Sequence, residues 1–454
     1  MEIVQIDMSN LFATGALSEG AVVRDRTLRE SVFQKVAAGC GKGMMFWTEL
    51  DRLCDWDSMC SHAETLRNSF DALVVLGIGG SALGTSALAY AFLPTYHNEL
   101  PREKRQGPKI YVMDNVEPDQ LHDLGETLCW ETTAFCVISK SGSTSETAAQ
   151  FAWVRAELMR RGLAAKKHVY VITEEGSQLQ RMAETDGNTC FLMPKGVGGR
   201  FSIFTAVGMF PALVLGIDAK QLRNGAKKMQ EVCSSAAENP ALWAAYAHWA
   251  EYQQGKSMAV VMPYANRLKY FSDYFAQLLA ESIGKRFDND GKEVCCGQTP
   301  IKSVGVTDQH SQLQLYMEGP ADKLVAFLEV GAFDHTLKIS DATDAGFLQG
   351  HTFNELLQSE LNGTRIALTQ QNRPNYTIVL PRIDAFCIGQ LIYLWQMQTA
   401  YLGAFFNVNA FDQPGVEEGK NITYAFMGKS GYEAKKAEAE KFCKTDARFV
   451  FPHL

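Results

Sequence analysis

The chain has 454 residues, with 43 basic and 51 acidic side chains and a net charge of −8. A chain of this length is too long to fold around a single hydrophobic core, so we expect two or three domains. No Lys/Arg stripe interleaved with aromatic residues appears, which excludes an evident nucleic-acid surface. The eleven cysteines include no C-x-x-C pair. The sequence therefore indicates neither a zinc site nor a disulfide framework, and we expect buried, reduced thiols in the cytosol.

The N-terminal stretch "MEIVQIDMSNLF" lacks a basic region, so it does not predict a signal peptide. Residues 385–408 are long and apolar, but Gln390, Gln396 and Gln398 interrupt them and no basic cluster flanks them. We therefore expect a buried core helix that runs into a strand, and not a membrane span. Together these features predict a cytoplasmic protein without a membrane partner.

In chain order, residues 1–57 alternate apolar and charged positions with a helical period and predict a helical lead-in. Short apolar runs follow, and helical stretches separate them. Such an alternation predicts a parallel sheet with helices on both faces. The runs lie at 72–80, 109–115, 134–140 and 168–173.

The second half of the chain repeats this design. Residues 198–218 read as one long apolar helix ending near Gly216, and a further helix is predicted at 268–285. We expect two α/β domains, one formed by 58–215 and a larger one by 1–57 together with 216–454, including terminal helices. A ligand is expected in a cleft outside the carboxyl ends of the strands. The second series of strands is predicted at 257–263, 323–330 and 376–382.

The first apolar run ends in "LGIGGSALG", residues 76–84. Glycines allow a tight turn and a close approach to a ligand, and the N–H groups of a helix beginning near Ser81 would attract an anion. Gly77, Gly79 and Ala82 also fit a loose dinucleotide fingerprint, with Asp114 available for a ribose. A tight turn without any ligand is an equal alternative for such a short motif.

The third run ends in "SKSGSTSET", residues 139–147, which holds six hydroxyl side chains. Hydroxyl groups can donate to phosphate oxygens alongside main-chain N–H groups, so a ring of them suits a terminal phosphate monoester. The P-loop pattern G-x-x-x-x-G-K-[ST] is absent. An ordinary Ser/Thr helix cap assisted by Glu146 remains the alternative.

Six blocks occur in one order between about residues 70 and 425: "IGGSALG", "SKSGSTSET", "GVGGRFSIFTAVG", "AESIGK", "DQHSQLQLYMEG" and "FDQPGVEEGK". Together they resemble the glucose-6-phosphate isomerase family. The resemblance implies two sugar-isomerase (SIS) domains, the smaller at 58–215, each a mainly parallel sheet flanked by helices, with a helical lead-in and a C-terminal helix. It further implies that the phosphate is bound by Gly80, Ser81, Ser139, Lys140, Ser141 and Thr144.

Gln277 and Glu281 are four residues apart on a predicted helix and share one face, and Gly284 follows as a plausible helix end. Aldose–ketose isomerisation needs one base that moves a proton between C2 and C1. An isolated glutamate near a helix end is usually a solvated residue. The resemblance implies that Glu281 is the base and that Gln277 contacts the substrate, although Ile283 replaces the polar residue of many relatives.

Arg200 and His310 each have an interpretation that involves no function. The arginine could form a salt bridge at the start of a helix, and the histidine could be an ordinary surface residue. A guanidinium can stabilise the negative charge of an enediolate, and an imidazole can open a sugar ring near neutral pH. The resemblance assigns these two roles to Arg200 and His310. It also implies that His310 reaches the site from a neighbouring subunit, so that a homodimer has two shared sites.

Gln413 and Lys420 lie seven residues apart in "FDQPGVEEGK". The resemblance implies that Lys420 contacts the ring oxygen and assists opening, while Gln413 helps to bind the phosphate. Without it, Lys420 would be an ordinary solvated lysine. Pro414 replaces a larger residue of relatives, and Glu146 is a weaker candidate for orienting His310.

The resemblance therefore implies an enzyme that interconverts glucose 6-phosphate and fructose 6-phosphate through a cis-enediol, without metal or organic cofactor. Neither H-x-H nor H-E-x-x-H nor clustered carboxylates appear in the sequence. Two alternatives stay open. A non-catalytic sugar-phosphate sensor would need the hydroxyl loop alone, and a nicotinamide oxidoreductase would use "GIGGSA" with Asp114 and bind dinucleotide saturably.

Overall fold

The structure is a computed structural model that describes residues 3–105 and 107–452. The chain divides into two compact units, Met1–Ala410 and Phe411–Leu454. The first unit contains two five-stranded sheets and a two-stranded hairpin. The second contains the helices α17 (Glu417–Phe426) and α18 (Glu433–Ala439), so the expected C-terminal helix is in fact two. The fold class is confirmed, with mainly parallel sheets flanked by helices.

The first sheet is fully parallel, with the order β3-β2-β4-β5-β6. The chain passes from β2 outward to β3 and then returns to β4 on the other side. The order thus reverses between β2 and β4, and such a switch point is where open α/β sheets bind ligands. The strands are β2 (Ala72–Leu76), β3 (Lys109–Met113), β4 (Thr133–Ile138), β5 (Val169–Glu174) and β6 (Thr189–Met193).

Four of these strands were predicted, and β6 was not. Both β2 and β4 are buried along their whole length, as expected for central parallel strands covered on both faces. In β6 exposed and buried positions are mixed because it forms the edge of the sheet, so its apolar run is too broken to identify. The helices of this region are α4 (Trp56–Ser69), α5 (Leu83–Phe92), α6 (Pro118–Thr127), α7 (Ser145–Arg160), α8 (Ala165–His168) and α9 (Gln178–Asp186).

The second sheet has the order β1-β12-β11-β7-β10, and only β1 is antiparallel to its neighbour. The predicted strands β7 (Met258–Pro263), β11 (Lys323–Ala332) and β12 (Asn375–Arg382) form its middle. Sequence reasoning missed the two edge strands, β1 (Gln5–Asp7) and β10 (Thr299–Lys302), and the hairpin of β8 (Lys285–Phe287) and β9 (Glu293–Cys296). All four are short, with three or four residues each, and offer little periodicity.

The lead-in is helical as expected, apart from the three-residue strand β1, which joins the second sheet. These three residues are extended because they pair with the edge of the sheet. Their own sequence is too short to predict a strand. The remaining helices of the second half are α11 (Ala219–Val232), α12 (Pro240–Gln253), α13 (Lys269–Ile283), α14 (Leu313–Glu318), α15 (Phe353–Gln370) and α16 (Ala385–Phe405). The lead-in contains α1 (Ser9–Ala13), α2 (Glu19–Arg24), α3 (Arg26–Gly39) and the 3₁₀ segment η1 (Gly43–Thr48).

The single helix predicted at 198–218 is wrong, because it consists of the 3₁₀ segment η6 (Gly199–Phe204) and the helix α10 (Ala206–Val214). Thr205 separates them with extended backbone, and its hydroxyl accepts the N–H of Val207. A side chain that caps a new helix in this way interrupts the old one. The break places Arg200 in η6 and leaves α10 buried.

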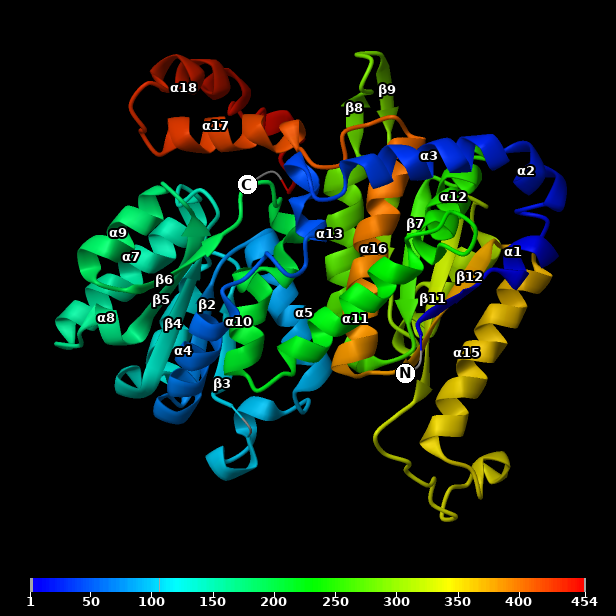
Figure 1. Ribbon diagram of the computed structural model, residues 1–454, viewed down its shortest axis with the longest axis horizontal. Helices are drawn as coiled ribbons and strands as arrows, with labels where there is room; N and C mark the ends of the chain where they lie inside the picture. Colours follow the sequence, from blue (N-terminus) through cyan, green and yellow to red (C-terminus); the bar gives the residue numbers. More distant parts are fainter. Residues whose placement is uncertain (1–2, 106, 453–454) are drawn as a thin grey trace. The chain divides into compact units, whose positions relative to one another are not determined.

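Helix α16 confirms the buried core helix, and no helix within the described residues is long and apolar enough to cross a membrane. The strand expected after it is wrong, because α16 ends in a turn in which Asn407 has φ 55°. Figure 1 shows α13 and α16 between the two sheets of the first unit. The buried amide of Gln396 donates to Phe201 O and to the hydroxyl of Tyr274, which explains how a glutamine is accommodated here.

Glu251 on α12 is an ionisable group inside this core. Its side chain is fully buried, one carboxylate oxygen accepts from Gln254 Nε2 at 3.1 Å, and burial raises its pKa to about 7. A raised carboxyl pKa means that folding favours the protonated form, so stability falls as pH rises from about 4.5 towards 7 and then levels off.

We expect Glu251→Gln to stabilise the protein above pH 7 by roughly 3 kcal/mol and to change little near pH 4.5. Urea unfolding at pH 5 and pH 8, at one protein concentration, measures this difference. The control is Glu231→Gln, at an exposed carboxylate paired with Lys228. An equal effect of Glu251→Gln at both pH values would show that Glu251 does not titrate with folding.

Candidate active site

The glycine turn after β2 is shaped by a close approach to η6. Gly79 has φ 55°, which favours glycine, and a Cβ on Gly80 would lie 2.3 Å from the main chain of Gly199. Ser81 ends the 3₁₀ turn, and α5 begins two residues later. The turn therefore brings Gly80 and Ser81, both predicted to bind phosphate, directly beside the segment that carries Arg200.

The hydroxyl loop, defined here as residues 139–144, follows β4, the strand next to β2 in the sheet. Ser139 Oγ donates to Thr144 Oγ1 at 3.2 Å and accepts the N–H of Gly142 at 3.2 Å, and Ser141 Oγ lies 2.9 Å from Ser143 Oγ. Because carboxyl ends of neighbouring parallel strands share one sheet edge, this loop and the glycine turn flank the switch point together.

The alternative of an ordinary helix cap is not what the structure shows for Thr144. Thr144 occupies the position before α7, but its side chain makes no capping hydrogen bond. The first N–H groups of a helix need an acceptor from outside the helix. These donors, beside a loop rich in hydroxyl groups, form a region suited to an anion.

Thr147 is a residue that the sequence-based prediction missed. It lies in the first turn of α7, its side chain is 2% exposed, and its Oγ1 has no hydrogen-bond partner within the described residues. A buried hydroxyl without a partner is unusual. The signal was available, because Thr147 closes the same "SKSGSTSET" run.

The Lys140 side chain is engaged elsewhere. Its Nζ lies 3.3 Å from Glu174 Oε1 at the end of β5, and both side chains are partly exposed. This ion pair turns the ammonium towards β5. The main-chain N–H of Lys140 is therefore the donor that the loop itself presents.

Glu281 lies on the last turn of α13 with both carboxylate oxygens bound. Oε1 accepts from Gln277 Nε2 at 3.0 Å, and Oε2 accepts from Arg200 Nη1 at 3.3 Å. The carboxylate side chain is about one third exposed, whereas that of Arg200 is 2% exposed. The predicted spacing of Gln277 and Glu281 on one helix face is thus realised, and the carboxylate retains access from outside.

Arg200 is held by at least three acceptors. Its Nε donates to Ser282 Oγ at 2.6 Å and its Nη2 to Ala410 O at 2.6 Å, in addition to the contact with Glu281. A planar guanidinium has several N–H donors in fixed directions, so it can bind acceptors that come from different segments of the chain. Ser282 and Ala410 were not predicted, since they are 82 and 210 residues from Arg200 in sequence.

The glycine turn and the Glu281 cluster are adjacent. A Cβ on Gly79 would lie 2.8 Å from Gln277 Nε2, and one on Gly80 would lie 2.7 Å from Arg200 N. The structure therefore brings the predicted residues Gly80, Gln277, Glu281 and Arg200 into one cluster.

The predicted residues His310, Gln413, Lys420 and Glu146 come from other segments of the chain. His310 ends the 3₁₀ segment η8 (Thr307–His310), where its ring is exposed and forms no hydrogen bond or ion pair within the described part of the chain. Gln413 and Lys420 belong to the second unit, and Lys420 Nζ pairs with Glu417 at 2.8 Å. Glu146 lies in the first turn of α7 and forms no hydrogen bond or ion pair with His310 among the described residues.

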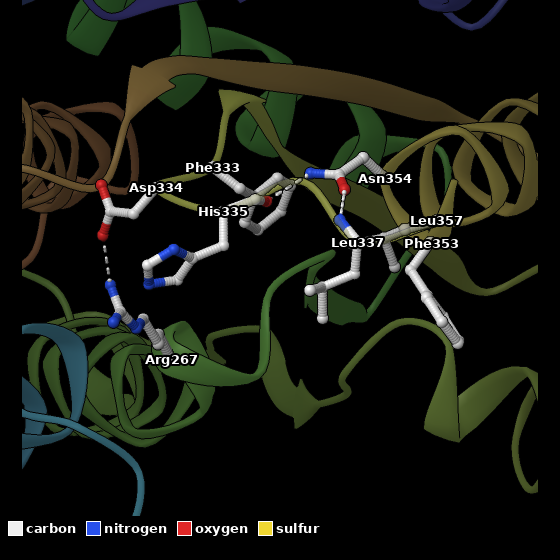
Figure 2. A pocket seen from close by; sticks show the side chains of 8 residues that line it. All are labelled: Arg267, Phe333, Asp334, His335, Leu337, Phe353, Asn354 and Leu357. Atoms are coloured by element: carbon white, nitrogen blue, oxygen red, sulfur yellow. Dashed lines mark hydrogen bonds and ion pairs between the residues drawn. The ribbon is translucent and has the colours of Figure 1, made fainter. Parts of the chain in front are cut away.

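Two pockets lie apart from these residues. Figure 2 shows one of about 260 Å³ beside the second sheet, with mainly apolar walls and an ion pair of Arg267 with Asp334 at 3.0 Å. The other contains Asp114, Tyr90 and Tyr270, and the glycine-turn residues do not line it. Asp114 nevertheless follows Met113, whose carbonyl accepts the N–H of Gly77 at 3.3 Å, so it lies at the same sheet edge as the glycine turn.

The cysteines agree only in part with the expectation from the sequence. All eleven cysteines are free, but Cys60, Cys129, Cys295 and Cys443 are exposed, so the expectation that the thiols are buried holds only for some. No group of three or more His, Cys, Asp or Glu side chains in the described ranges could hold a metal ion.

The comparisons with known proteins agree with one another. Residues 54–444 match the family model described as phosphoglucose isomerase. A glucose-6-phosphate isomerase of Carboxydothermus hydrogenoformans is 46% identical over 396 residues, which cover 86% of this chain and 85% of the relative. One of Rubrobacter xylanophilus is 42% identical, over 80% of this chain and 83% of that protein.

Solved structures show the same fold. A hypothetical protein of Thermus thermophilus matches 94% of this chain and 100% of its own, with a TM-score of 0.84 and 32% identity. A glucose-6-phosphate isomerase of Chlamydia trachomatis has a TM-score of 0.74 at 24% identity, covering 85% and 76% of the two chains. The fold and the sequence relatives place the protein among the isomerases. The chain belongs to the phosphoglucose isomerase family.

Proposed function

We propose that this protein interconverts glucose 6-phosphate and fructose 6-phosphate. The observation that carries the proposal is the Glu281 carboxylate, partly exposed and held by Arg200 and Gln277 beside the glycine turn. One base within reach of two adjacent carbons is the requirement of aldose–ketose isomerisation. The named activity of the relatives is the same reaction.

In the proposed mechanism the phosphate is anchored first. The donors are the N–H and hydroxyl groups of the glycine turn and the hydroxyl loop, with Thr147 as an addition. Anchoring the phosphate limits the positions that the sugar carbons can take relative to Glu281, which reduces the entropy lost on reaching the transition state. The proposed phosphate ligands are Gly80, Ser81, Ser139, Lys140, Ser141, Thr144 and Gln413.

Glu281 then removes the proton from C2 and returns it to C1 through a cis-enediol. Negative charge develops on the substrate oxygens during this step, and the preoriented guanidinium of Arg200 stabilises it. Gln277 keeps one carboxylate oxygen in place by its hydrogen bond. The proposed steps use protein side chains alone, in keeping with the expectation of no cofactor.

Ring opening precedes proton transfer, and we assign it to His310 and Lys420 on the strength of the family resemblance. The exposed position of His310 is compatible with a role in a second copy of the chain. The proposal therefore includes a homodimer with shared sites, located in the cytoplasm and acting in glycolysis and gluconeogenesis. The division into domains 58–215 and 1–57 with 216–454 is likewise retained as a proposal.

The test of this function is a coupled assay in which fructose 6-phosphate is converted and glucose 6-phosphate is detected by its dehydrogenase. Absence of conversion by the pure protein would refute the proposal. A fluorescence titration with NADH addresses the oxidoreductase alternative, and saturable binding there would favour it.

His310→Ala is expected to slow the reaction of the cyclic sugar more than that of the open-chain form, since imidazole is needed only for ring opening. Stopped-flow measurements on freshly opened and ring-closed substrate compare the two. His122→Ala, at another exposed histidine, is the matched control. Equal slowing of both forms would remove His310 from ring opening.

A further inference from the structure

The hydroxyl loop is held from behind by the end of β5. Thr173 is fully buried, and its Oγ1 donates to Ser139 O at 2.7 Å and lies 3.1 Å from Lys140 O. The N–H of Glu174 donates to Lys140 O at 3.1 Å. Both carbonyl groups at the start of the loop are therefore directed towards β5.

This direction determines where the next two N–H groups point. In a trans peptide the C=O of one residue and the N–H of the following residue lie on opposite sides of the chain. With the carbonyls of Ser139 and Lys140 turned towards β5, the N–H groups of Lys140 and Ser141 face away from it. Neither N–H has a hydrogen-bond acceptor within the described residues. Two adjacent main-chain donors are thus left available on the side of the loop that faces away from the sheet.

The hydroxyl of Thr173 is itself held in one orientation. Its single proton goes to the loop carbonyl, so Ser177, whose Oγ lies 2.8 Å away, must donate to Thr173 Oγ1. Ser177 Oγ also accepts the N–H of Gln180 and caps α9. A chain of hydrogen bonds therefore runs from the cap of α9 through Thr173 to the loop.

We propose that Thr173 is a positioning residue for phosphate binding, which sets the Ser139–Lys140 and Lys140–Ser141 peptide planes so that their N–H groups meet the phosphate. The inference rests on the proposed function, because it assigns the ligand of those N–H groups. Thr173 is buried behind the loop and acts through the main chain without contacting the substrate.

The experiment compares Thr173→Val, which removes the hydroxyl at nearly constant volume, with Thr173→Ser, which keeps it. The matched control is Thr133→Val at the opposite end of β4, where an equally buried Oγ1 donates to Cys129 O at 2.7 Å. We expect Thr173→Val to raise KM for fructose 6-phosphate about tenfold with kcat within twofold, because anchoring is shared by ground state and transition state. Thr173→Ser should restore KM to within twofold, and Thr133→Val should leave it unchanged.

A second measurement separates this inference from the proposed function. Calorimetric titration with inorganic phosphate reports anion binding without any turnover, and Thr173→Val should weaken it about tenfold relative to Thr133→Val. If the parent protein does not convert fructose 6-phosphate, the proposed function fails and this titration still decides the role of Thr173. Equal phosphate affinity in the two variants, or no binding to the parent, would overturn the inference.

Ser177→Ala covers the case in which Thr173→Val does not fold. It removes the donor to Thr173 from a partly exposed position, so the fold is less affected. We expect KM to rise two- to threefold with kcat kept. An unchanged KM in a folded Ser177→Ala protein would then count against the chain of hydrogen bonds and against the inference.

Discussion

Replacing Glu281 with glutamine is expected to lower kcat about a thousandfold while substrate binding is largely kept. The amide has nearly the shape of the carboxylate but cannot accept a proton, and general base catalysis typically contributes factors of about 10² to 10⁴. A coupled assay gives kcat, and calorimetry with fructose 6-phosphate gives the affinity. Exchange of the C2 hydrogen with deuterated solvent should stop as well.

The control for this change lies on the same helix. Asp273 is two turns earlier on α13 and pairs with Lys302 at 2.6 Å, so Asp273→Asn removes a carboxylate without touching the cluster. We expect it to retain near-parental turnover. Unchanged turnover in Glu281→Gln, or continued exchange at C2, would show that another group is the base.

Arg200→Lys is expected to reduce kcat by about 10² to 10³, the loss typical of one preoriented donor to a developing oxyanion. Lysine keeps the positive charge, but one ammonium cannot reproduce donors directed at Ser282, Ala410 and Glu281 at once. The ammonium would therefore leave at least one buried acceptor without a partner, and the thermal midpoint should fall as well.

Arg105→Lys separates the loss of stability from the loss of catalysis. The Arg105 side chain is also 2% exposed, and it pairs with Asp71 at 2.5 Å at the amino end of β2, the opposite edge of the sheet. A similar fall of the thermal midpoint with normal kcat is expected there. If Arg200→Lys also kept a normal kcat, the role of Arg200 would be structural and not catalytic.

Much of the fold could be predicted from local sequence patterns. Buried strands such as β4 could be predicted from their unbroken apolar runs. Gln277 and Glu281 could be predicted to share a face because the helical period places residues four apart on one side. Short edge strands, such as β1, depend on a neighbour that is distant in sequence. Propensity alone could not identify them.

The site was predicted residue by residue where a motif was present, but its internal connections were not. The partners of Arg200 come from segments 81 to 210 residues away, and no local spacing encodes them. The same holds for the pairing of Lys140 with Glu174 and for the hydroxyl of Thr173 behind the loop. These contacts depend on how strands and helices pack, which periodicity does not report.

The contact of Gly80 with Gly199 has a practical meaning for redesign. Main chain meets main chain there, so Gly80 cannot accept a side chain without moving Gly199 and Arg200, whereas a Cβ on Gly199 would meet nothing within 4 Å. Libraries aimed at new sugar acceptors should leave Gly80 untouched and keep Ser141, a proposed phosphate ligand, whereas Ser143, whose side chain is exposed, can be varied.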